Sequence, residues 1–308
     1  MLNEQSRTRT FSLDDVDWSR PLDVSRDWMP EAFVSASYLP SFAQLPAEIR
    51  RRYNQLNALA VCEQFVWFEE DLISRVITNL LGSNELTGDL RLCLENFVRE
   101  EERHSEMFKR VLLKAEPDYY SNHKYQYFTL TRFQSKFFEN VVARPHLFLV
   151  WTWMAIYFEE RTLHISQLYR RAERASSQDQ KIDETFSRVH FLHMIDEARH
   201  LQIDQYLLEA FFVHESAWKK RLAAHLTHKV FEAYRAPKRI ALRILETLKK
   251  EDPSVTNVCD QIASELPLLA TSPEFKHAMF SNEALGRTRE LLKSHPEMKA
   301  AYQSLAGR

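Results

Sequence analysis

Glycine is nearly absent from the middle of this chain. The 308 residues contain only four glycines, at Gly82, Gly88, Gly286 and Gly307, so none lies between residues 89 and 285. Tight β-hairpins and phosphate-binding loops need glycine at their turns. A stretch of this length without glycine favours long helices joined by polar connections, and we therefore predict an all-α fold.

The composition narrows the class of protein further. With 44% hydrophobic residues, a chain of this length can bury a sizeable core in one large domain, or in one domain with an appendage. A net charge of -2 gives no general attraction to nucleic acid or to anionic membranes. The cysteines (Cys62, Cys93 and Cys259) lack paired spacing, and no signal peptide or long apolar run is apparent. We therefore expect a cytoplasmic protein with reduced thiols and no membrane segment.

Four segments have the pattern of long helices, and they span about residues 46–81, 87–114, 145–175 and 182–212. The connection between the second and third is long, with a polar, tyrosine-rich stretch at 116–126 and a shorter helix at about 129–142. A long crossover of this kind is typical of a four-helix bundle. On the first helix we expect Asn57 to face solvent, opposite the apolar stripe.

The flanking regions carry less information. We expect an N-terminal arm at 1–45, a bundle domain at 46–250 and short C-terminal helices packed on the bundle at 251–308. Residues 215–250 form one or two helices and are basic. The simpler interpretation of these basic residues is a solvent-exposed helix face. The more specific alternative is a binding site for an acidic carrier protein or a ferredoxin. The basic positions lack interleaved aromatics, which argues against nucleic acid. They are Lys219, Lys220, Arg221, Lys229, Arg235, Lys238, Arg239 and Arg243.

The fourth long helix contains the run His193-Met194-Ile195-Asp196-Glu197-Ala198-Arg199-His200. His193, Glu197 and His200 are spaced i, i+4 and i+7, so all three project from one helix face. A carboxylate and two imidazoles are costly to bury unless a positive charge lies among them. This spacing predicts a metal site.

The second long helix contains a matching run, Glu100-Glu101-Glu102-Arg103-His104. Glu101 and His104 form a second Glu-x-x-His pair on a single helix face. In both runs an acid precedes the ligand glutamate, and an arginine precedes the histidine. A third Glu-x-x-His, from Glu274 to His277, follows Ser-Pro on a short C-terminal segment, and we interpret it as a chance match.

The first and third long helices each offer a glutamate. Glu69 interrupts the apolar stripe of the first helix, with Glu70 nearer its flank. Glu159 and Glu160 follow an unbroken apolar run on the third helix, and the helical period does not choose between them. A carboxylate in a core stripe needs a partner, so each helix contributes a candidate ligand.

The order Glu, Glu-x-x-His, Glu, Glu-x-x-His is the ligand set of a carboxylate-bridged dimetal site in a ferritin-like four-helix bundle. Four carboxylates compensate two ferrous ions, and hard oxygen donors with a few nitrogens suit iron or manganese better than zinc or copper. We predict two iron ions, with a mixed manganese and iron pair as the alternative. Glu100 and Asp196 are placed to orient the ligand histidines across the bundle.

These motifs resemble two known families. The two acid-Glu-x-Arg-His runs, together with Phe158-Glu159-Glu160-Arg161 and Glu69-Glu70-Asp71, look like the ligand helices of soluble acyl-carrier-protein desaturases. That resemblance implies Glu69 and Glu160 as the single-glutamate ligands. His193, four residues before Glu197, is instead similar to the extra histidine of dinuclear iron arylamine N-oxygenases, which make nitro groups from aminobenzoates. That resemblance covers about residues 45–250 and implies His193 as a seventh ligand.

The resemblance implies an oxygenase that uses O2 to convert an arylamine to hydroxylamine, nitroso or nitro products in specialised metabolism. It further implies an amine substrate and an external electron donor, either a ferredoxin or a flavin reductase; a homodimer is a further candidate assembly. Inward aromatics, Trp67, Phe97, Trp153 and Tyr157 among them, are expected to line the substrate pocket. The implied ligands are Glu69, Glu101, His104, Glu160, His193, Glu197 and His200.

Two alternatives remain open at this point. The first is a carrier-linked acyl or aminoacyl desaturase or hydroxylase, for which His193 should matter little. The second, of another class, is a ferroxidase or iron-binding protein, although ferritins are much shorter single bundles.

Overall fold

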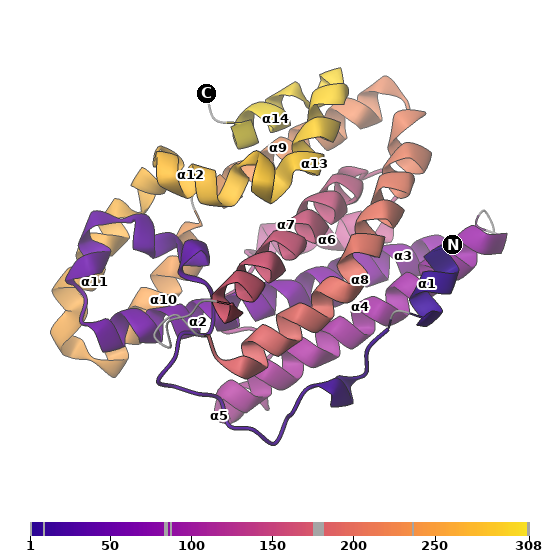
Figure 1. The fold of residues 1–308 in the computed structure, drawn as a ribbon. Coiled ribbons are helices and arrows are strands. Elements are labelled where there is room, and N and C mark those ends of the chain that lie inside the picture. Colours follow the sequence, from indigo (N-terminus) through magenta and orange to yellow (C-terminus); the bar gives the residue numbers. More distant parts are fainter. Residues whose placement is uncertain are drawn as a thin grey trace.

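Four long helical segments lie side by side and form a bundle (Figure 1). The computed structural model describes residues 2–8, 10–82, 86, 88–174, 182–235 and 237–306, and no strand occurs among them. The segments are α2 (Ala47–Val66) continued by a π-helical turn, η5 (Trp67–Ile73), and α3 (Ser74–Leu81); α4 (Gly88–Ala115); α7 (Val150–Glu173); and α8 (Glu184–Leu208) with a second π-helical turn, η7 (Glu209–Val213). The predicted all-α fold is confirmed, and the four predicted long helices match these segments within a few residues.

Helix α7 shows how the sequence builds the bundle. Its buried residues Thr152, Ala155, Glu159, Thr162 and Ser166 recur every three or four positions and form one stripe. All but Glu159 are small, which allows a close approach, and α7 packs along α8 over much of its length. The stripe therefore carries a single carboxylate into an otherwise small-residue face.

The crossover between α4 and α7 is held by a buried carboxylate, Glu63. Its oxygens accept hydrogen bonds from the backbone N–H groups of Gln126, Tyr127 and Phe128 at 2.5–2.9 Å and from the Tyr120 hydroxyl at 2.8 Å. The crossover also contains α5 (Pro117–Tyr120) and α6 (Arg132–Ala143). The two oxygens of Glu63 already accept four hydrogen bonds, so Glu63 has a structural role and is not a candidate metal ligand.

The N-terminal arm begins with α1 (Leu2–Thr8) and then runs along the bundle as short 3-10 turns (Leu13–Asp15, Glu31–Phe33, Ser35–Tyr38 and Pro40–Gln44). Asn54 anchors it by accepting from the backbone N–H of Trp28 and donating to the carbonyl of Met29. From the sequence, Asn57 is expected to face solvent, but the arm covers it. The Asn57 amide is buried and donates a hydrogen bond to the carbonyl of Phe33 in the arm.

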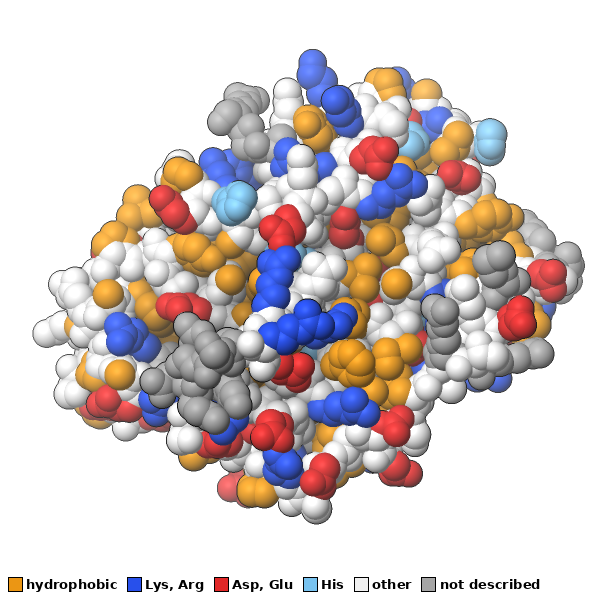
Figure 2. Space-filling model, viewed as in Figure 1, with side chains coloured by type: hydrophobic (Ala, Val, Ile, Leu, Met, Phe, Trp, Pro, Cys, Tyr) orange, Lys and Arg blue, Asp and Glu red, His pale blue; other side chains and the backbone are white. Residues whose placement is uncertain are grey.

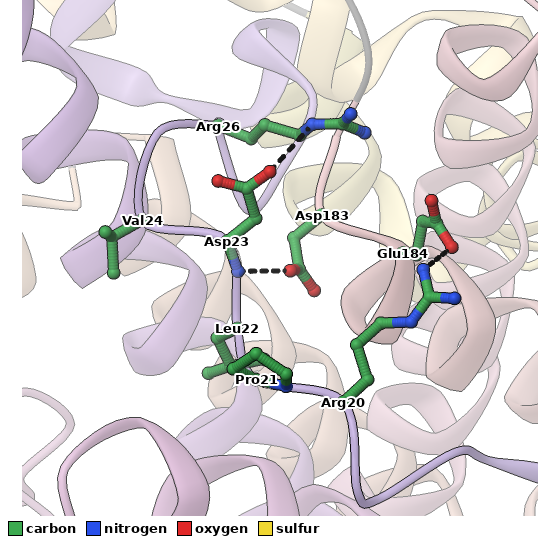
Figure 3. Close-up of a pocket in the computed structure, with 8 residues that line it drawn as sticks. All are labelled: Arg20, Pro21, Leu22, Asp23, Val24, Arg26, Asp183 and Glu184. Atoms are coloured by element: carbon green, nitrogen blue, oxygen red, sulfur yellow. Dashed lines mark hydrogen bonds and ion pairs between the residues drawn. The ribbon is translucent and has the colours of Figure 1, made fainter.

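Figure 3 shows a second anchor, where the arm meets the start of α8. Asp183 caps α8 by accepting from the backbone N–H of Thr185 and Phe186, and its other oxygen accepts from the N–H of Asp23 at 2.8 Å. A surface hollow of about 430 Å³ opens beside it, rimmed by Arg20 and Arg26. Asp183 precedes His193 by ten residues, which is roughly 15 Å of rise along α8.

The C-terminal helices cover one side and one end of the bundle (Figure 1). Helix α13 packs on α7, α14 on α9, and α10 on α2. No helix in the described part of the chain is both long enough and apolar enough to cross a membrane. On the face drawn in Figure 2, side chains of both charges are interspersed. The helices are α9 (Ala217–Arg235), α10 (Lys238–Glu251), α11 (Thr256–Glu265), α12 (Pro273–Phe280), α13 (Asn282–Ser294) and α14 (Lys299–Ala306), with 3-10 turns at Pro253–Val255, Leu266–Ala270 and Pro296–Met298.

Candidate metal centre

Six of the seven predicted ligands meet in the interior of the bundle. They come from three of its four segments, and none is more than 2% exposed. The π-helical turn η5 supplies Glu69, α4 supplies Glu101 and His104, and α8 supplies His193, Glu197 and His200.

The donor atoms of these six residues form two overlapping groups. In each group the atoms lie within 4.8 Å of one another: Glu101, His104, Glu197 and His200 make one, and Glu69, His104 and His193 make the other. His200 Nδ1 lies 2.8 Å from Glu101 Oε1, and His193 Nε2 lies 2.8 Å from Glu197 Oε1 and 3.0 Å from Glu69 Oε1. Two adjoining groups fit two neighbouring ions, and the shared residue, His104, could bind only one of them because its Nε2 is held by Asp196.

Several of these buried atoms lack a hydrogen bond of acceptable geometry. They include both carboxylate oxygens of Glu101 and the Nδ1 atoms of His104 and His200. Burial, and then the charge of Glu101, raises the pKa of Glu69 well above its usual value. Burial opposes protonation of His200, but the charges of Glu101 and Glu197 outweigh it and raise its pKa. A cation would satisfy these groups together, so the residues fit a metal pair.

The outer nitrogens of the two motif histidines are bonded crosswise between α4 and α8. His104 Nε2 lies 3.1 Å from Asp196 Oδ2, and His200 Nε2 lies 2.9 Å from Glu100 Oε2. Arg199 joins the two acids, with Nη2 at 2.7 Å from Glu100 and 2.8 Å from Asp196. Because ionised carboxylates only accept, each Nε2 carries a proton, and in the neutral ring Nδ1 offers its lone pair to the cluster. His200, whose pKa is raised, must release its second proton before its Nδ1 can bind a metal.

Glu69 sits in the π-helical turn, which the sequence analysis did not anticipate. A π turn takes in an extra residue, and such turns occur mostly at functional sites. It turns Glu69 inward, where Ser105 Oγ lies 3.4 Å from its Oε2. The neighbouring Glu70 points outward and pairs with Lys109 and Lys124.

Glu160 lies away from the other six residues. Its two oxygens accept from the backbone N–H groups of Arg287 and Thr288 at 2.6 and 2.7 Å, at the start of the kinked helix α13. Adjacent residues on a helix differ by about 100° in direction. Glu159 therefore points in a different direction from Glu160 and is only 2% exposed. This placement differs from the expectation of Glu160 as a ligand and favours the open alternative, Glu159.

The model of the family described as "P-aminobenzoate N-oxygenase AurF" matches residues 1–248 of the 308. The chain belongs to this family. The match spans the arm, the whole bundle and most of α10, and it confirms the predicted family and enzyme class. A search of curated proteins found no match.

In this N-oxygenase, the sequence analysis missed a further buried acid, Asp204. It continues the stripe of His193, Glu197 and His200 at i+11, a signal that was present in the sequence. Both of its oxygens are buried without a hydrogen-bond partner, and burial raises its pKa well above the usual value. The stripe of buried polar side chains on α8 thus extends one helical turn beyond His200, to Asp204.

The N-terminal arm of the N-oxygenase covers the outer side of the cluster. Ser6 donates a hydrogen bond to Glu100, and the ring of Phe11 stacks parallel to that of His104 with centroids 5.8 Å apart. The Arg103 guanidinium also lies over the Phe11 ring, 4.6 Å from the ring centre. These contacts bury the hydrogen bonds that orient the histidines.

Proposed function

We propose that this enzyme N-oxygenates a primary arylamine that carries a carboxylate, using a pair of iron ions. The observation that carries the proposal is the two adjoining groups of buried carboxylate and imidazole donors in a chain of this family. Oxygen donors with a minority of nitrogens suit iron and manganese. When bound, the metal pair supplies the activation of dioxygen, with electrons drawn from an external donor.

We propose Glu69, Glu101, His104, Glu159, His193, Glu197 and His200 as the ligands. Full burial and convergence of their donor atoms support the six that are grouped together. Buried donor atoms of Glu101, His104, Glu197 and His200 also lack a hydrogen-bond partner. For Glu159 the support is its burial on α7, which packs along α8, and the engagement of Glu160 with α13.

The remaining polar residues orient this set. Glu100 and Asp196 hold the two motif histidines in one tautomer, and Arg199 fixes the two acids relative to each other. Partners of this kind keep the ligand rings turned toward the metal and raise their basicity. We propose Glu100, Asp196 and Arg199 as positioning residues.

Aromatic side chains close the cluster to water. The ring of Phe97 lies 4.2 Å from that of His200, and Phe65 and Phe108 lie 5.1 and 5.0 Å from that of His193. Trp153 and Tyr157, expected to line the pocket, instead contact Phe212 and Phe231 on the side of the C-terminal helices. We propose that the arylamine ring binds against the first three, where apolar walls exclude water and strengthen electrostatic interactions.

The test combines metal analysis with product analysis. We expect two irons per chain after anaerobic reconstitution with ferrous salt. With dithionite and then O2, 4-aminobenzoate should yield the hydroxylamine or nitro compound, identified by mass spectrometry. Fewer than one metal per chain would refute the metal pair. Iron deposition without any amine product would favour the ferroxidase alternative, and oxidation of a carrier-bound acyl chain the desaturase alternative.

A further inference from the structure

Helices α6 and α10 begin next to each other and form a basic surface. Arg239 donates to the side-chain oxygen of Gln134 at 2.5 Å, which joins the two helix starts. Arg243 donates to the carbonyl of Gln126 in the preceding crossover at 2.7 Å. We call this surface the α6–α10 patch and define it by Arg132, Phe133, Lys136, Lys238, Arg239 and Arg243.

The charge of the patch is uncompensated. In the described part of the chain, none of its five basic side chains forms an ion pair with a carboxylate. Two exposed acids lie nearby on the same helices. Glu139 on α6 forms no ion pair with a patch residue among the described residues, and Glu246 on α10 is paired with Lys249, outside the patch. Phe133 stands among the basic residues with 80% of its surface exposed. A basic rim around an exposed aromatic ring fits an acidic protein surface.

A series of aromatic ring contacts begins at Phe137, one helical turn from the exposed Phe133, and leads inward. Phe133 and Phe137 share a face of α6 at i and i+4. The rings of Phe137 and Phe138 are 5.0 Å apart, and those of Phe138 and Trp67 are 4.9 Å apart. Trp67 opens the π-helical turn, two residues before Glu69. Packed rings therefore run from Phe137, one helical turn from the patch, to the segment that carries a proposed metal ligand.

We propose that the α6–α10 patch docks an acidic one-electron carrier protein that reduces the metal pair. The inference rests on the proposed function, because only a redox metal pair needs this donor. Two carriers bind in succession; each is oxidised by one electron, and together they reduce two ferric ions to ferrous. A second copy of this chain fits the patch poorly, since like charges would oppose one another across a symmetric contact. The route to Glu69 favours an electron carrier over nucleic acid.

Binding is the first test, and it does not depend on turnover. Titration calorimetry at low salt would use an oxidised plant-type [2Fe–2S] ferredoxin and the reconstituted enzyme. Arg132→Glu with Lys238→Glu reverses two patch charges at helix starts, where an acid is compatible with the helix dipole. Arg221→Glu with Lys229→Glu on α9 makes the same charge change elsewhere. We expect the patch variant to bind about tenfold or more weakly, and the α9 variant to bind within about twofold of the unmodified protein.

Several outcomes would overturn the proposal. These are an absence of ferredoxin binding at low salt, an equal loss in both variants, or binding of an acyl carrier protein but not ferredoxin at the patch. A shift from dimer to monomer in the patch variant, seen by light scattering, would assign the surface to a second copy instead.

The inward route has its own test. Trp67→Phe keeps an aromatic ring but shortens it, and should slow anaerobic reduction by ferredoxin, followed by absorbance, without changing reduction by dithionite or ferredoxin affinity. Equal rates with ferredoxin would reject the route. If dithionite-reduced enzyme yields no amine product, the proposed function fails while ferredoxin binding remains measurable, so the two failures are distinguishable.

Discussion

Replacing Arg199 with leucine should weaken both the fold and the metal site. Arg199 is buried, and its Nη2 lies 2.7 Å from Glu100 and 2.8 Å from Asp196. After the change, Asp196 keeps Arg103 at 2.6 Å, whereas Glu100 keeps only His200 and Ser6. The variant therefore leaves the buried carboxylate of Glu100 without an arginine partner.

Removing one partner of a buried ion pair costs about 3–5 kcal/mol. We expect the lower end, about 3 kcal/mol, because Arg103 still compensates Asp196. For a chain of this size that corresponds to a fall in Tm of about 6 °C. Metal affinity should fall about 10–100-fold, since the acids would hold the histidines less firmly.

The loss of stability caused by Arg199→Leu should depend on pH. Burial would raise the pKa of Glu100, but the hydrogen bond and charge of His200 and the contact with Arg199 hold it at about 2. A carboxyl with a depressed pKa stabilises the fold above its unfolded pKa and loses that effect as the pH falls toward the folded one. The stability difference caused by Arg199→Leu should thus be full near neutrality and shrink as the pH falls from about 4.5 toward 2.

Scanning calorimetry of the metal-free protein and titration with ferrous ion would measure both effects. Arg103→Leu is the matched control, because the side chain of Arg103 is 22% exposed and contacts Asp196 alone of the two acids. A Tm within about 1 °C of the unmodified protein for Arg199→Leu, or a larger effect of Arg103→Leu, would refute the argument.

Three further predictions follow from the buried carboxylates. Glu159→Gln should reduce iron to below two per chain by elemental analysis, whereas Glu160→Gln should leave two; the reverse result would restore Glu160 as the ligand. Burial raises the pKa of Glu69 and Glu197 in the metal-free protein, so their stabilising contribution is lost as the pH rises through those values. Metal binding should release protons and tighten with pH, as calorimetry in buffers of different ionisation enthalpy would detect; pH-independent affinity would contradict this. Glu63→Ala should cost about 3 kcal/mol or more in urea unfolding, since three backbone N–H groups lose their acceptor, and a loss under about 1 kcal/mol would show that water replaces it.

Sequence reasoning reached most of the cluster because regular spacing determines which residues share a helix face. His193, Glu197 and His200 needed only a helical period, and Glu69 stood out as a charge in an apolar stripe. The choice between Glu159 and Glu160 required tertiary contacts. Both are partly or fully buried, but only the docking of α13 shows what takes up the Glu160 carboxylate.

Asp204 was missed although the helical period pointed to it, but two other missed features have no local signal in the sequence. Asn57 is polar and lies on the outer face of its helix, yet the arm covers it. The π-helical turn at Glu69 interrupts a continuous helix without any glycine or proline to mark it. Local propensity carries no information about either.

The crosswise bonding of the two motifs has a consequence for how the site can be assembled and altered. Each histidine is oriented by an acid from the other motif, about one hundred residues away along the chain. A growing chain that has been made only as far as α4 holds three of the seven proposed ligands, and its His104 lacks the acid that orients it. Its affinity for metal should therefore be acquired in one step when α8 arrives. For the same reason, neither motif can be transplanted alone into another bundle: the smallest portable unit is the pair.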